Sequence, residues 1–104
     1  MIPLAVPNLT GNEKNYLEHC IDTTYVSSVG EYVSKLEQMT ANATGSDFAV
    51  ATSAGTTGLH AALMAVGVSP GDLVILPTFT FIASANAAAH CKAIPWLMDI
   101  DDTW

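Results

Sequence analysis

Hydrophobic and polar residues alternate in two different ways along the chain, with a change near residue 45. In the first part, apolar residues recur at helical spacing, which predicts one helix over about residues 11–23 and a second over residues 31–44. Thr10 and Glu13 have the spacing of a capping box at the start of the first helix. Gly45 can adopt the left-handed conformation that ends the second.

In the second part, short apolar runs alternate with longer alanine-rich segments. The runs at residues 48–52, 73–76 and 94–98 predict strands, and the segments at 56–66 and 80–90 predict helices. Strands that are apolar throughout are typical of a parallel sheet with helices on both faces. The second part is therefore predicted to be an open, mostly parallel α/β sheet with flanking helices.

The charge of the chain restricts its partners. Its 104 residues include 10 acidic and 3 basic side chains, and the net charge of −7 argues against nucleic acid or an anionic membrane. Cys20 and Cys91 lack CxxC spacing and are predicted to be free thiols of a cytosolic protein. The first residues lack the basic region of a signal peptide, which also favours a cytoplasmic location. A small or neutral ligand is expected.

A glycine-threonine turn stands between the first predicted strand and the helix after it, in the sequence TSAGTTGLH at residues 52–60. This order places Thr56 and Thr57 in the first helical turn, where backbone N–H groups have no partner within the helix. Gly55 lets an anion approach those N–H groups, so the turn is predicted to bind a phosphate. The alternative is that Ser53 or Gly55 only caps a buried helix. The spacing matches neither a Walker A loop nor GxGxxG.

A second turn, in the sequence LPTFTFIASAN, carries two aromatic residues from a strand into a helix. Phe79 or Phe81 could stack on a flat heterocycle held beside the phosphate turn. The alternative is that both phenylalanines belong to the core.

The three histidines are dispersed along the sequence and predict no metal site. His60, in the helix after the glycine-threonine turn, is more consistent with packing than with catalysis. His19 and His90 carry no functional signal.

Four ordered blocks carry a resemblance to a known family: IPLAVPNLTGNE, YVSSVG, SAGTTGLHAALMAVGVSPGD and LPTFTFIASANAAAHCKAIPWLMDID. Together they resemble the amino-terminal third of the DegT/DnrJ/EryC1/StrS aminotransferases. These are enzymes dependent on pyridoxal 5'-phosphate (PLP) that aminate keto sugars on nucleotide carriers. The opening blocks are most similar to the branch that aminates nucleotide-linked 4-keto-6-deoxy sugars on routes to bacillosamine- or legionaminic-type sugars.

The resemblance implies a domain organisation and a site. Residues 1–45 would form an amino-terminal helical segment with a substrate loop, and residues 46–104 an incomplete cofactor-binding large domain of fold type I. The resemblance implies that Thr56 and Thr57 bind the PLP phosphate, beside Gly55, and that Phe81 stacks on the pyridine ring. It places Ser28 and Gly30 near the sugar nucleotide. It also implies a homodimer, with glutamate as the expected amino donor.

Transamination by PLP needs a lysine that binds the cofactor covalently. Lys14, Lys35 and Lys92 do not match that lysine, which comes later in the family's sequences, as does the aspartate that pairs with the pyridine nitrogen. The chain is therefore expected to hold no catalytic residue and to be inactive alone. The predicted strand at 48–52 is expected to pair with a strand from outside the chain.

Two other function classes remain open. Sugar 3-dehydratases of the same family share these turns but have histidine in place of the lysine, at a position beyond Trp104. A nucleotide-binding module without catalytic activity would need an acidic residue at the end of its second strand to bind ribose. The sequence LVILPTF has none there, which counts against the module.

Overall fold

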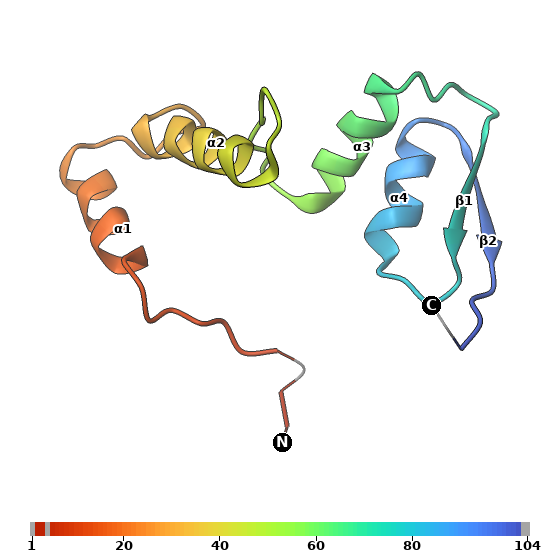
Figure 1. The fold of residues 1–104 in the computed structure, drawn as a ribbon, viewed down its shortest axis with the longest axis horizontal. Coiled ribbons are helices and arrows are strands. Elements are labelled where there is room, and N and C mark those ends of the chain that lie inside the picture. The colour runs from red at the N-terminus through yellow and green to blue at the C-terminus, as the bar shows by residue number, and fades with distance from the viewer. Residues whose placement is uncertain (1, 4, 103–104) are drawn as a thin grey trace. The chain divides into compact units, whose positions relative to one another are not determined.

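The computed structural model describes residues 2–3 and 5–102 of the chain. They form two compact units, Met1–Val50 and Ala51–Trp104. Figure 1 shows the helices of the first unit in red to yellow and the helices and strands of the second in green to blue.

The first unit contains two helices, α1 (Glu13–Asp22) and α2 (Glu31–Thr44). The predicted bounds of α2 are confirmed, and Gly45 ends it in the left-handed conformation with φ of 68°. This conformation lets the Gly45 N–H donate a hydrogen bond to a carbonyl of the last helical turn.

The start of α1 differs from the prediction. The residue that precedes the helix is Asn12, and its side chain makes no capping hydrogen bond. The Thr10 hydroxyl instead donates to Asn8 Oδ1 at 2.8 Å, so the predicted capping box between Thr10 and Glu13 does not form. A local side-chain hydrogen bond in the preceding segment competes successfully with the cap.

The second unit runs in the order α3 (Gly55–Ala65), β1 (Leu73–Pro77), α4 (Ile82–His90) and β2 (Ile94–Met98). The two strands pair in parallel, with Leu73 opposite Ile94 and Pro77 opposite Met98. The right-hand side of Figure 1 shows α4 beside the pair, as expected for a crossover between parallel strands. The α/β class and the parallel pairing of the sheet are confirmed.

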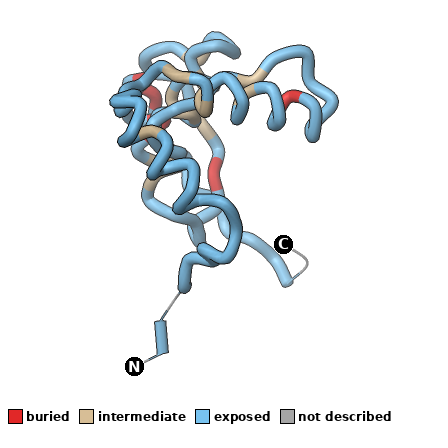
Figure 2. The backbone as a smooth tube through the Cα atoms, turned by 90° about the vertical axis from the view of Figure 1, so that its left-hand side faces the viewer, coloured by how far each residue is buried: buried red, intermediate tan, exposed pale blue. Residues whose placement is uncertain are grey.

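Small side chains form the core of the second unit. Helix α4 packs against both strands, and α3 packs against α4. The buried residues of this unit are Leu76, Ala87, Ala88, Cys91 and Ala93, part of the red segments in Figure 2. Alanine at these positions lets the α4 backbone approach the sheet closely. Cys20 and Cys91 are free, as predicted.

Among the described residues of the second unit, α4 is the helix that packs against the two strands. Helix α4 covers the face of Leu76, whereas Leu73, Ile75, Ile94 and Trp96 on the opposite face are exposed. Their apolar character is typical of strands in a parallel sheet that is buried on both faces.

The strand predicted at residues 48–52 is absent, which corrects the prediction. The sheet of the described residues consists of β1 and β2, and both Phe48 and Val50 are exposed. A strand forms only beside a neighbour that accepts and donates its ladder hydrogen bonds, whatever the β-propensity of its residues.

Residues 73–90, a stretch without aspartate, glutamate, lysine or arginine, form β1, a turn and α4. Across the part of the chain that the structure describes, no helix is both long enough and apolar enough to cross a membrane.

Candidate functional site

The glycine-threonine turn forms the amino-terminal end of α3. The helical hydrogen bonds begin with the Gly58 N–H, which donates to the Ala54 carbonyl at 3.0 Å. Within the described residues, the backbone N–H groups of Gly55, Thr56 and Thr57 therefore have no carbonyl partner. Three adjacent donors at the positive end of a helix dipole are suited to an anion.

The two glycines of this turn have different roles. A methyl group built on Gly55 would have no atom within 4 Å, so the space beside its backbone is open. The same group on Gly58 would lie 3.0 Å from Thr52 Oγ1, so Gly58 lets the preceding segment pack against α3. Only Gly55 leaves room for a ligand next to the unpaired donors.

The two threonine hydroxyls are also unequal. Thr57 Oγ1 donates to the Ala54 carbonyl at 2.7 Å and accepts from the Ala54 N–H at 3.2 Å. Its proton is thus donated to the Ala54 carbonyl, whereas the Thr56 hydroxyl makes no hydrogen bond among the described residues. The N-cap position is occupied by Ala54, not by Ser53 or Gly55, and the Ala54 N–H donates to Thr57 Oγ1.

The aromatic turn precedes α4, and Phe81 occupies the N-cap position of that helix. Phe79 and Phe81 are 78% and 79% exposed, so neither belongs to a core of the described chain. Exposure alone does not distinguish the two rings. In Figure 1, α3 and α4 both start toward the end of the unit at which the strand arrows point, so both turns lie at that end.

Thr78 fixes the aromatic turn to the sheet, a role that sequence reasoning missed. Its N–H and its hydroxyl both donate to the Met98 carbonyl, at 2.8 and 2.7 Å. The start of the turn is thus anchored at the carboxyl end of β2, shortly before Phe81 and the first residue of α4. A threonine directly after a predicted parallel strand was the available signal.

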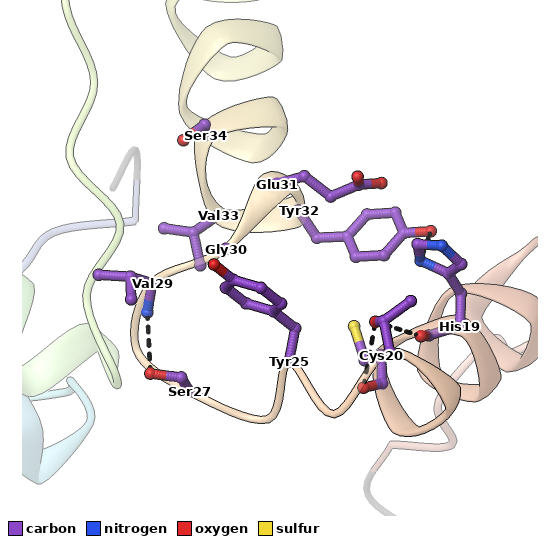
Figure 3. Close-up of a pocket in the computed structure, with 11 residues that line it drawn as sticks. His19, Cys20, Tyr25, Ser27, Val29, Gly30, Glu31, Tyr32, Val33 and Ser34 are labelled. Carbon is purple, nitrogen blue, oxygen red and sulfur yellow. Dashed lines mark hydrogen bonds between the residues drawn. The ribbon is translucent and has the colours of Figure 1, made fainter.

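The loop before α2 contains the residues expected near the sugar nucleotide. Gly30 has φ of 156°, which favours glycine, and a methyl group there would lie 3.2 Å from the Tyr25 ring. Gly30 therefore lets Tyr25 pack over the start of α2, as Figure 3 shows. Gly30 lines an open pocket of about 690 Å³, whereas Ser28 does not, although Ser27 and Val29 on either side of it do.

Aromatic and polar side chains surround one side of this pocket. The Tyr32 hydroxyl and His19 Nδ1 share a hydrogen bond of 3.1 Å, and the two rings meet edge to face. Partial desolvation raises the pKa of the Tyr32 phenol above its ordinary value, and the Glu31 carboxylate raises it further.

The histidines are less dispersed than the sequence suggested. The rings of His60 on α3 and His90 on α4 have their centres 5.5 Å apart. Among the described residues, no group of three or more histidine, cysteine, aspartate or glutamate side chains could hold a metal ion.

Comparison with known proteins identifies the family. The model of the DegT/DnrJ/EryC1/StrS aminotransferase family matches residues 7–104. The chain belongs to this family. It is 48% identical over 100 residues to the GDP-perosamine synthase of Caulobacter vibrioides, covering 96% of the chain and 27% of that protein.

Solved structures agree with this assignment. An aminotransferase from Psychrobacter cryohalolentis superposes with a TM-score of 0.82 at 30% identity, covering 95% of the chain and 26% of the solved protein. Spr1654 from Streptococcus pneumoniae in its PLP form gives a TM-score of 0.77 at 29% identity, covering 96% and 25%. The chain thus spans about a quarter of the length of these relatives, rather than the third that the resemblance suggested.

Proposed function

We propose that the chain is part of a PLP-dependent aminotransferase that transfers an amino group from glutamate to a GDP-linked 4-keto-6-deoxy sugar. The cofactor part of the proposal is supported by one observation above all, the three unpaired N–H groups beside the open face of Gly55. The choice of GDP as the nucleotide is supported by the similarity to GDP-perosamine synthases. This similarity favours a GDP-linked substrate over the substrates of the routes to bacillosamine- or legionaminic-type sugars.

The residues of the second unit fit the cofactor. The N–H groups of Gly55, Thr56 and Thr57 would donate to the phosphate, and the free Thr56 hydroxyl would add a fourth donor. The exposed ring of Phe81 would stack on the pyridine ring. When bound, PLP supplies the electron-accepting ring through which an amino group can leave one carbon and join another.

The substrate side of the proposal concerns the first unit. Ser28 and Gly30 lie in the loop before α2, and Gly30 lines the pocket there. We propose that this loop contacts the sugar nucleotide and that the complete protein is a homodimer, as the resemblance implies.

Labelled substrates test the reaction. Full-length protein is incubated with PLP, a GDP-linked 4-keto-6-deoxy sugar and glutamate that carries an isotopic label on its amino nitrogen. The expected product is a GDP-linked amino sugar that contains the label and is absent when glutamate is omitted. A product that has lost oxygen at carbon 3 and contains no label would indicate a dehydratase and overturn the aminotransferase.

A further inference from the structure

The contact between His60 and His90 stands apart from the proposed cofactor site. His60 lies in the middle of α3, and His90 is the last residue of α4. No aspartate, glutamate, lysine or arginine lies on the helices and strands of the second unit, all of which the structure describes. The nearest charged residue along the chain is Lys92, two positions after His90.

The spacing of the two rings suits a shared metal ion. Two imidazoles bound to one tetrahedral ion at about 2.0–2.1 Å have ring centres about 5 Å apart. The observed separation is 5.5 Å, with an angle of 39° between the ring planes.

The position at the end of α4 also favours a cation. The last carbonyl groups of a helix carry partial negative charge, and His90 occupies the last turn of α4. His60 is half-buried and His90 is exposed, so solvent can reach the pair.

We propose that His60 and His90 form a two-histidine site for a divalent transition metal such as Ni²⁺ or Zn²⁺. Imidazole is a preferred ligand of these ions. Because no third protein ligand joins the pair in the described chain, water completes the coordination. A bound ion connects α3 to α4 and so stabilises the packing of the two helices.

Calorimetric titration of the purified, reduced protein with Ni²⁺ tests the site. The matched variants are His60→Gln and His90→Gln, with His19→Gln on α1 as the control. Each of the first two should remove one equivalent of binding or weaken it by at least about tenfold, and the control should not.

Two further measurements guard against misfolded variants. In the wild-type protein, paramagnetic Ni²⁺ should broaden the ring signals of His60 and His90 in NMR spectra before those of His19. The melting temperature should rise with Ni²⁺, and this rise should be lost in both variants. Unchanged binding in His60→Gln and His90→Gln, or selective broadening of His19, would overturn the site.

Discussion

The two units are stabilised in different ways. All but one of the buried residues that the structure describes lie in the second unit, where α4 packs against β1 and β2; the exception is Ala41 on α2. In the first unit, α1 has no buried residue and meets α2 through the contacts of Tyr32 with His19 and Tyr16. The second unit therefore has a core of its own, whereas the first has aromatic and polar contacts in place of one.

The largest expected effect tests this difference directly. Leu76 is 6% exposed beneath α4, and Leu76→Ala should lower the free energy of unfolding by about 2–5 kcal/mol. Leu36 on α2 is 59% exposed, and Leu36→Ala should cost less than about 1 kcal/mol. Urea unfolding measures both. An equal loss in the two variants would show that the first unit also has a core.

The next effect concerns the two threonines of α3. Thr56→Val should weaken PLP binding by about 1.5–3 kcal/mol, because it removes a hydrogen bond to a charged phosphate. Thr57→Val should instead lower stability by about 0.5–1.5 kcal/mol, because the Thr57 hydroxyl makes two hydrogen bonds with the Ala54 backbone. Cofactor titration and urea unfolding of full-length protein separate the two roles. PLP affinity unchanged in Thr56→Val would contradict the phosphate assignment.

A smaller effect distinguishes the two exposed rings. Phe81→Leu keeps apolar volume but loses stacking, so PLP binding should weaken by about 0.5–1.5 kcal/mol. Phe79→Leu serves as the control, since its ring is equally exposed on the same turn. Retention of PLP is measured by absorbance after gel filtration. If only Phe79→Leu weakens retention, the stacking ring is Phe79.

The features that the sequence predicted correctly depend on residues that are close together along the chain. The bounds of α2 and its end at Gly45 follow from helical periodicity and from a single permissive residue. The prediction of a strand at residues 48–52 was wrong, because a strand needs a partner strand, and the local pattern of apolar residues does not show whether one is present. The contact of His60 with His90 was missed for the same reason, since it joins residues from two helices.

In the candidate site, too, some features were predictable from local sequence and others depend on contacts in three dimensions. The position of Gly55 and its neighbours at a helix start was predictable from the strand-to-helix pattern. The unequal roles of Thr56 and Thr57 were not, because they depend on which hydroxyl turns back to the Ala54 carbonyl. The anchor from Thr78 to Met98 likewise depends on the pairing of β1 with β2.

The smallest effect concerns the hydrogen bond that joins the helices of the first unit. The pKa of Tyr32 is raised mainly by desolvation and further by the Glu31 carboxylate. In an absorbance titration at alkaline pH, Tyr32 should therefore ionise above the ordinary tyrosine pKa of about 10. This late-ionising tyrosine signal should be missing in Tyr32→Phe. In Glu31→Gln the pKa of Tyr32 should fall but stay raised, because desolvation remains.

A group with a raised pKa in the folded state binds its proton more tightly there than in the unfolded chain. Its contribution to stability is thus complete below the unfolded pKa of about 10 and is lost as the pH rises through the folded value. Tyr32→Phe should therefore make the stability of the protein less sensitive to alkaline pH, and an unchanged pH dependence would show that Tyr32 is solvated like a free tyrosine.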